Sequence, residues 1–176
     1  METSFGPDGS GRPNRAAYHD AMSRLGASVS IVTTAGPAGR CGLTVSSATS
    51  VSDDPPIVLV CINRSARTCD VLTQNGVFAV NVLAGGSEQL ADAFAGRFNY
   101  SVSERFGLTE WNHNPAGSGA PILPSARVTL DCALFDSKDT ATHRVVFGEV
   151  VGIHLGQPSE ALVYLDRRYV AIGRPD

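Results

Sequence analysis

Two short stretches of the sequence carry residue types that could bind a flat, polar ligand. The first is GLTVSSATSVS at Gly42–Ser52, where small and hydroxylated side chains interrupt a run that otherwise has strand character. Small side chains let a ring approach the backbone, and hydroxyl and N–H groups can hydrogen-bond a polar ring edge, a sugar chain or a phosphate. The same composition also suits a Ser/Thr-rich edge strand that binds nothing.

The second stretch is CINRSART at Cys61–Thr68, which we expect to run from the end of a strand into the start of a helix. The N–H groups at a helix N-terminus carry partial positive charge, so Arg67 with Ser65 or Thr68 could hold a phosphate there. A capped helix with solvated arginines would have the same sequence. Together the two stretches predict a site for a ring with a charged tail.

The elements that must position these stretches are mostly strands. Continuous or alternating apolar residues predict strands at 28–34, 42–51, 57–62, 77–83, 128–134, 143–155, 161–165 and 169–172. Helices are expected at 15–26, at 66–75 with Ser65 as N-cap and Gly76 as stop, and at 87–95. Residues 96–124 show no clear hydrophobic periodicity, and they predict a long irregular segment with about one helical turn. About seven or eight strands with two or three short helices make the protein mainly β and favour a closed or nearly closed barrel over βαβ units.

Length and composition limit the class of protein. The 176 residues suit one domain, and we expect a tail at residues 1–14 followed by a single domain at 15–176. With 43% hydrophobic and 18% charged residues, disorder is disfavoured, and scattered arginines leave no stretch long enough to cross a bilayer. A formal charge of −3 disfavours nucleic acid as a partner. The N-terminal region has no apolar run, so we expect a cytoplasmic protein without a membrane anchor.

Several catalytic and cofactor motifs are absent from the sequence. It has no G-x-G-x-x-G after a strand, no G-x-x-x-x-G-K-[ST] and no G-x-S-x-G, which disfavours Rossmann cofactor binding, P-loop chemistry and an α/β-hydrolase nucleophile. The cysteines and histidines show no zinc-like spacing, so we expect reduced thiols and no metal.

The order of several segments resembles a known family. The segments GLTVSSATSVSDDPPIVLVCIN, GVFAVNVLAGGSEQLADAFAG, HRVVFGEV and LVYLDRRY follow one another across about residues 18–173. In this the chain resembles the flavin reductase-like family. It is most similar to the short reductase components of two-component flavin-dependent monooxygenases, such as that of 4-hydroxyphenylacetate 3-monooxygenase. The first two segments are specific to the family and the others support them.

This resemblance implies a split β-barrel with Greek-key connections that works as a homodimer. It implies that the protein binds FMN or FAD, reduces it with NADH or NADPH, and releases the reduced flavin to a partner monooxygenase. The resemblance implies that no acid or base is required, because hydride passes directly from the nicotinamide ring to the stacked flavin ring. The protein orients the two rings and stabilises the charge that develops on the flavin. Two alternatives stay open: a flavoprotein with tightly bound FMN that reduces another acceptor such as corrin cobalt, and a non-catalytic flavin-binding module.

The resemblance also implies roles for particular residues. The flavin ring and ribityl chain would contact Thr44, Val45, Ser46, Ser47 and Ser50, with Cys61, Ile62 and Asn63 beside them. The phosphate would be held by Ser65, Arg67 and Thr68, and the other side of the flavin would be covered by Phe94, Ala95, Gly96 and Arg97. The positions beside the nicotinamide are those of His143 and Tyr169.

Three of these residues have simpler explanations from the sequence alone. His143 suits a strand-end histidine with a local hydrogen bond, and Tyr169 suits a packed aromatic near the C-terminus. Cys61, between apolar neighbours, suits a small apolar filler.

Overall fold

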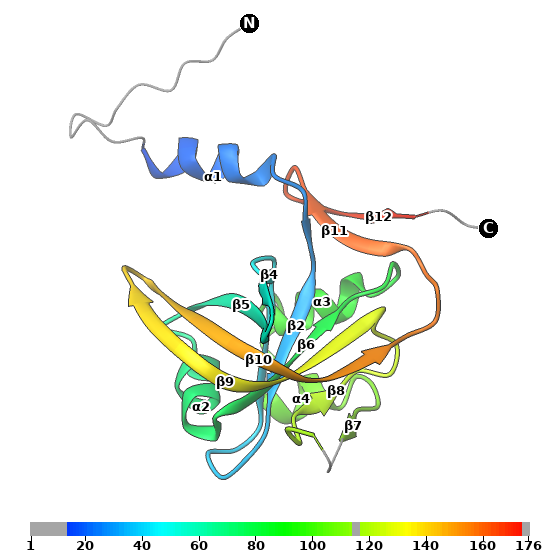
Figure 1. Cartoon of the computed structure of the whole chain (residues 1–176). Helices are drawn as coiled ribbons and strands as arrows, with labels where there is room; N and C mark the ends of the chain where they lie inside the picture. The colour runs from blue at the N-terminus through cyan, green and yellow to red at the C-terminus, as the bar shows by residue number, and fades with distance from the viewer. Residues whose placement is uncertain (1–13, 114–116, 174–176) are drawn as a thin grey trace, which may run out of the picture.

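The centre of the molecule is one antiparallel sheet, seen in a computed structural model that describes residues 14–113 and 117–173 (Figure 1). Its seven strands lie in the order β3-β2-β6-β9-β10-β5-β4. Their bounds are β2 Ser30–Thr34, β3 Cys41–Val45, β4 Thr49–Asp53, β5 Pro56–Asn63, β6 Val77–Val82, β9 Val128–Thr140 and β10 His143–Leu155. The predicted mainly β fold is therefore confirmed. The sheet is not closed, because β3 and β4 are its two edges.

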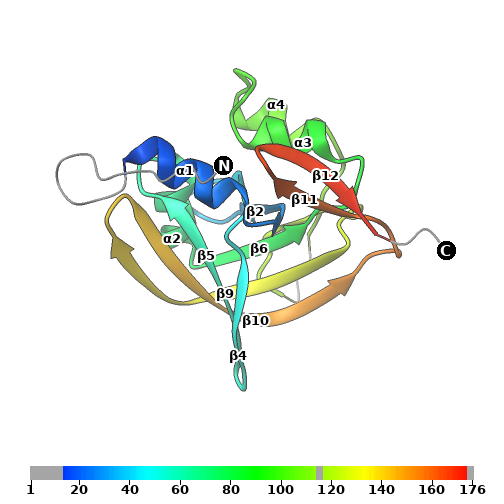
Figure 2. The same ribbon diagram turned by 90° about the horizontal axis from the view of Figure 1, so that it is seen from above.

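Two smaller sheets and four short helices surround this sheet in the part of the chain that the structure describes. The three-stranded sheet joins β1 (Ala27–Ser28), β11 (Ala161–Leu165) and β12 (Arg168–Ile172), and the two-stranded sheet joins β7 (Asn112–His113) and β8 (Pro121–Ile122). The helices are α1 Arg15–Ser23, α2 Arg67–Asn75, α3 Glu88–Phe94 and α4 Val102–Phe106. Figures 1 and 2 show α1 outside the main sheet, next to the turn between β11 and β12. Asp166 in that turn donates its backbone N–H to Ser23 O at 2.7 Å.

Three local expectations were wrong. The single strand expected at 42–51 is two strands, because β3 pairs with β2 whereas β4 pairs with β5. The strand expected at 128–134 continues to Thr140, since β9 stays paired with β10 almost to the turn. The N-cap of α2 is Ala66 rather than Ser65, whose hydroxyl binds Asn63 instead.

Other expectations about the helices were met. Gly76 ends α2 in the left-handed conformation, with φ 68°, and its N–H donates to Leu72 O. The helical turn expected within 96–124 is α4, which begins with a capping box formed by Ser101 and Glu104. The tail predicted at residues 1–14 lies outside the described residues except for Asn14, whose side chain caps α1.

The core forms two clusters, one on each side of β2. One packs the sheet against α2 and includes Val60, Ile62 and Phe78. The other packs the sheet against α3 and α4 and includes Ile31 and Phe94. These apolar contacts hold the ends of β3 and β5 in fixed positions relative to α2 and α3, and burial of such side chains is the main stabilising term in folding.

A buried amide ties several strands together. Asn81, on β6, is fully buried, and its Oδ1 accepts hydrogen bonds from Leu123 N at 2.8 Å and Thr129 Oγ1 at 3.0 Å. Its Nδ2 donates to Ile31 O at 3.0 Å and to Thr33 Oγ1 at 3.1 Å. One side chain therefore satisfies polar groups of β2, β9 and the segment after β8.

The described residues contain neither a membrane-spanning helix nor a metal-binding cluster. None of the helices there has the length and apolar character needed to span a membrane. No cluster of three or more His, Cys, Asp or Glu side chains in the same residues is arranged to hold a metal ion.

Candidate functional site

The chain crosses between the two edges of the sheet at Ser46–Ala48. The β4–β5 register pairs Thr49 with Leu59, and the same register places Ser47 opposite Cys61. Instead of a backbone pair, the Ser47 hydroxyl binds Cys61: Oγ accepts from Cys61 N at 3.0 Å and donates to Cys61 O at 3.2 Å. One side chain thus extends the contact between the β3–β4 link and β5 beyond their last backbone pair, Thr49 with Leu59.

A cavity lies where β3 ends. Its volume is about 150 Å³, and its lining residues are Val29, Thr44, Val45, Ser46, Arg97, Tyr164 and Tyr169. Thr44 Oγ1 donates to Ala91 O at 2.7 Å, which ties β3 to α3. Five residues singled out from the sequence therefore share one cavity: Thr44, Val45, Ser46, Arg97 and Tyr169.

The far wall of this cavity is aromatic. The rings of Tyr164 and Tyr169 meet edge to face with centroids 5.6 Å apart, and the Arg97 guanidinium lies 5.7 Å from the centroid of Tyr169. Arg97 Nε is 3.1 Å from Asp92 Oδ1 of α3, so this ion pair holds the guanidinium beside the Tyr169 ring of β12. Burial raises the pKa of Tyr169 to about 12, and the Asp92 carboxylate adds to this. The phenol therefore stays protonated at neutral pH and cannot serve as a base.

The start of α2 is suited to an anion. Its N-cap is Ala66, whose methyl group cannot accept a hydrogen bond from the first-turn N–H groups. Asn63 Oδ1 accepts from both the N–H and the hydroxyl of Ser65, and Arg67 is exposed. Thr68 is 6% exposed and its Oγ1 donates to Gly42 O at 3.3 Å, so the helix start is attached to β3.

A second arginine, Arg64, precedes this helix and is bound to other groups. Arg64 Nε lies 3.2 Å from Asp139 Oδ2, and Arg64 Nη1 donates to Ala141 O at 3.3 Å. Arg144 binds the same carboxylate at 2.6 Å, and this hydrogen bond holds the pKa of Asp139 below its ordinary value. Arg64 is therefore committed to the β9–β10 turn, whereas Arg67 remains available at the helix start.

Of the remaining residues predicted to contact the flavin, some are buried in the core and others are exposed. Ile62 is fully buried and Phe94 is 2% exposed, so both side chains belong to the core. Phe94 also explains Gly42, because a Cβ at Gly42 would lie 2.9 Å from Phe94 Cε1. Ser50 is exposed on β4, opposite Val58. After α3, Ala95, Gly96 and Arg97 are exposed, and Gly96 has a φ of 77°.

The two residues predicted beside the nicotinamide are not brought together within one chain. His143 begins β10 opposite Asn63, and its Nδ1 lies 2.9 Å from Thr142 Oγ1, so the local hydrogen bond left open by the sequence is present. Tyr169 lies on β12, in the other sheet. Figures 1 and 2 place the β9–β10 turn and β12 at opposite sides of the molecule.

The sequence analysis missed Tyr164, which lines the cavity, and Asp92, which binds the lining residue Arg97. Tyr164 pairs directly with Tyr169 across the β11–β12 turn, and Asp92 anchors Arg97. The segment LVYLDRRY contains the pattern that could have revealed Tyr164, because two tyrosines flank a tight turn at positions that face each other in a hairpin.

Comparisons with known proteins point to one family. The flavin reductase like domain matches residues 22–173. A protein of Variovorax paradoxus (strain S110) named FMN reductase (NADH) RutF is 44% identical over 161 residues, which cover 92% of this chain and 87% of that protein.

Two solved structures share the fold over nearly the whole chain. BorF, the flavin reductase component of a bacterial two-component tryptophan halogenase, superposes with a TM-score of 0.85 at 27% identity, covering 92% of this chain and 100% of that one. The NADH:FAD oxidoreductase SgcE6 of Streptomyces globisporus C-1027, solved with NAD and FAD fragments, has a TM-score of 0.84 at 28% identity, covering 97% and 98%.

Proposed function

Because the chain belongs to the flavin reductase-like family, we propose that it is an NADH-dependent flavin oxidoreductase that supplies reduced flavin to a partner monooxygenase. The observation that carries this proposal is the cavity at the end of β3, bounded by Ser46 and the Tyr164–Tyr169 pair. The same strand is bonded through Gly42 to the start of α2, which suits a phosphate. A ring site and an anion site on one strand match the two ends of a flavin nucleotide.

The residues present fit a flavin. The lining at Thr44–Ser46 is compact and bears hydroxyls, so a flat ring can approach the backbone there. The first turn of α2 and the exposed Arg67 supply donors and charge for a phosphate. When bound, the flavin supplies the hydride acceptor. The protein's own part is to orient the ring beside the Tyr164–Tyr169 wall, and Tyr169 keeps its proton throughout.

The choice of FMN and NADH rests on the relatives. The Variovorax protein is named for FMN and NADH, and the Streptomyces protein for NADH and FAD. We propose FMN and NADH as the preferred pair for this chain. Delivery to a monooxygenase is supported by the two-component system to which BorF belongs. A cytoplasmic location stays a prediction.

We also propose that the protein works as a homodimer. The β9–β10 turn, next to which His143 begins β10, and β12, which carries Tyr169, lie at opposite sides of one chain (Figures 1 and 2). If both residues flank one nicotinamide, a second chain must supply one of them. The end of β10 supplies an uncovered apolar surface, since Val151, Ile153 and Leu155 are 51%, 62% and 82% exposed. Contiguous exposed apolar side chains of this kind mark interaction surfaces.

Anaerobic mixing tests the proposed reaction directly. With the protein, NADH and FMN together, we expect the visible absorbance of the oxidised flavin to disappear as an equal amount of NADH is consumed. The same mixture without protein is the control. Unchanged flavin absorbance with both NADH and NADPH would contradict the proposal. Flavin that is lost from the protein on gel filtration would support its release to a partner, and retained flavin would contradict that step.

Thiol alkylation tests the position of the ring without turnover. Cys41, Cys69 and Cys132 are at most 2% exposed, so the reagent reaches them poorly. Burial also raises the pKa of Cys69 and raises that of Cys132 to about 12, so these two thiols form little reactive thiolate. Cys61 is half-buried. We expect iodoacetamide to modify Cys61 first, and saturating FMN to slow that modification several-fold, as followed by mass spectrometry. A rate for Cys61 that FMN does not change would place the ring elsewhere.

A further inference from the structure

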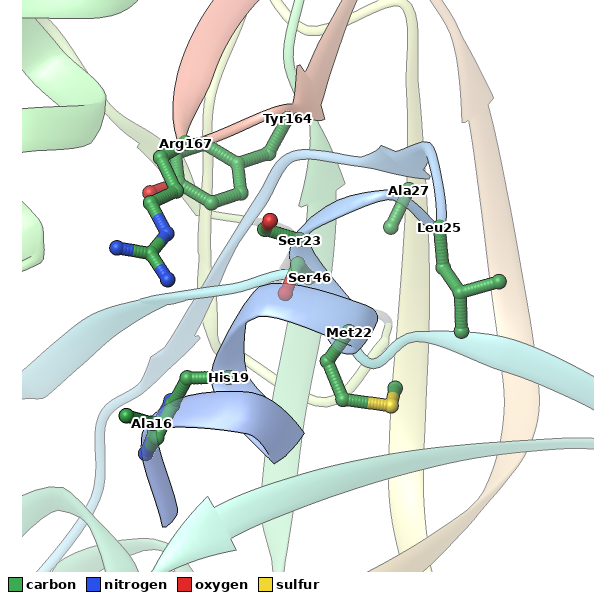
Figure 3. Close-up of a pocket in the computed structure, with 9 residues that line it drawn as sticks. All are labelled: Ala16, His19, Met22, Ser23, Leu25, Ala27, Ser46, Tyr164 and Arg167. Atoms are coloured by element: carbon green, nitrogen blue, oxygen red, sulfur yellow. The ribbon is translucent and has the colours of Figure 1, made fainter. Parts of the chain in front are cut away.

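One charged side chain lines the cavity at the end of β3. Among the lining residues that the structure describes, only Arg97 carries a charge. Arg167 lines a neighbouring groove of about 660 Å³ between α1 and the β11–β12 turn, which shares only Ser46 and Tyr164 with the cavity (Figure 3). Any side-chain charge that the cavity wall presents to a bound ring therefore comes from Arg97.

The end of α3 brings Arg97 back to its own helix. Gly96 adopts a φ of 77°, and its N–H donates to Ala93 O at 3.2 Å. The Arg97 N–H donates to Asp92 O at 3.1 Å. These two hydrogen bonds form a Schellman motif, in which a left-handed glycine reverses the chain at the end of a helix. The reversal lets the Arg97 side chain meet that of Asp92, with Nε 3.1 Å from Oδ1.

Asp92 acts on both residues of this wall. Its carboxylate pairs with Arg97, whose guanidinium lies 5.7 Å from the centroid of the Tyr169 ring. Burial raises the pKa of Tyr169, and the nearby Asp92 carboxylate raises it further. Asp92 is not among the residues that line the cavity, whereas Arg97 is. The carboxylate is therefore farther from a bound ring than the guanidinium that it holds.

Hydride transfer changes the charge of a flavin ring. The C4–H bond of the reduced nicotinamide breaks, and its hydrogen and both electrons form a bond to the flavin N5. The nicotinamide becomes a cation, and the neutral flavin ring gains a negative charge, which a positive group beside it stabilises. We propose that Arg97 stabilises this charge, and that Asp92 is the positioning residue that holds Arg97 at the cavity. This inference rests on the function proposed above and adds a catalytic residue to it.

Binding of FMN in its two oxidation states tests Arg97 without turnover. Both forms carry the same phosphate, so the ratio of their dissociation constants isolates the charge on the ring. By anaerobic calorimetry, we expect Arg97→Gln to lower the preference for reduced over oxidised FMN about fivefold, and Arg97→Lys to restore most of it. The effect is modest because the Arg97 side chain is 52% exposed and water screens its charge. Equal losses of affinity for both forms would overturn the inference.

The kinetics of flavin reduction provide a second readout. The negative charge develops in the transition state, so Arg97→Gln should lower kcat and leave the KM for NADH nearly unchanged. A higher KM with an unchanged kcat would show that Arg97 binds the nicotinamide substrate instead, and would overturn the inference.

Replacement of Asp92 by asparagine tests the positioning role. The amide cannot form an ion pair, so Arg97 is free to turn towards solvent, and the preference for reduced FMN should fall part of the way to that of Arg97→Gln. Asp92→Glu should restore it. Asp92→Asn should also lower the pKa of Tyr169, as followed by tyrosinate absorbance with Tyr169→Phe as the reference. An unchanged or stronger preference for reduced FMN in Asp92→Asn would overturn the positioning role.

Arg168→Gln is the matched control for these variants. Arg168 is exposed next to Tyr169 on β12 but does not line the cavity, so the preference for reduced FMN should stay within about twofold. A wild-type protein that binds both forms of FMN but oxidises neither NADH nor NADPH would contradict the proposed function, and the ratio of affinities would still decide the role of Arg97. A wild-type protein that binds neither form would overturn the inference.

Discussion

Replacement of Arg67 by glutamine is expected to weaken FMN binding by about tenfold, because a charge-assisted hydrogen bond to phosphate contributes roughly 1.5 kcal/mol or more. The position of Arg67 supports this size of effect. It follows Ala66, whose side chain cannot cap α2, so the guanidinium and the first-turn N–H groups can act on the same anion. Quenching of flavin fluorescence during titration measures the dissociation constants.

Riboflavin and a neighbouring arginine provide the controls for this prediction. Riboflavin has the same ring but no phosphate, so Arg67→Gln should change its affinity by less than about twofold. Arg64→Gln removes an arginine from the same loop that is already bound to Asp139 and Ala141 O, so FMN affinity should change little. Equal losses for FMN and riboflavin in Arg67→Gln would show that this residue does not hold the phosphate.

Replacement of Asn81 by leucine is expected to lower the free energy of unfolding by about 4 kcal/mol. Leucine has the same branched skeleton of four side-chain heavy atoms as asparagine, but it leaves the Leu123 N–H and the Thr129 hydroxyl without their acceptor in the core. It also removes the donor to Ile31 O. Each buried polar group left unpaired costs about 1–3 kcal/mol, and several are lost together. Urea denaturation followed by circular dichroism gives the difference.

The exposed Asn99 is the matched control for this substitution. Asn99→Leu makes the same chemical change at a surface position, where the free energy of unfolding usually shifts by less than about 0.5 kcal/mol. If Asn81→Leu lowered the stability by no more than Asn99→Leu, the hydrogen bonds of Asn81 would not be the link that joins β2, β6 and β9.

The strands with continuous apolar sequence could be predicted almost residue by residue. The run at 57–62 became β5 at Pro56–Asn63, and the run at 77–83 became β6 at Val77–Val82. Both are covered on two faces, so burial alone determines their character. Gly76 could be placed as the end of α2 because a left-handed residue is needed there and glycine adopts it freely.

Polar strands could not be predicted in this way. The residues of β9 beyond Leu134 are mostly exposed and show no alternation, and they are held by backbone pairing with β10 rather than by burial. The division of 42–51 into β3 and β4 depends on how the two edges of the whole sheet meet. A local window of sequence contains no information about that long-range geometry.

The candidate site shows the same limit. The residues that follow one another in sequence, Thr44 to Ser46, occupy one cavity because a single strand carries them. Tyr164 was missed because its place depends on the register of the β11–β12 hairpin. The separation of His143 from Tyr169 was also hidden, because it depends on which sheet each strand joins. The roles of all these residues in binding stay predictions.

The bridge made by the Ser47 hydroxyl has a consequence for how binding and folding are coupled. The backbone pairing of β4 with β5 ends at Thr49 and Leu59, and beyond that pair lies a seam where the Ser47 hydroxyl alone holds Cys61. A ligand bound at the seam would add contacts between the two strands where backbone hydrogen bonds are missing. Binding should therefore stabilise this part of the sheet against unfolding. Release of the ligand removes this stabilisation. Such a seam suits the proposed release of the flavin after each reduction.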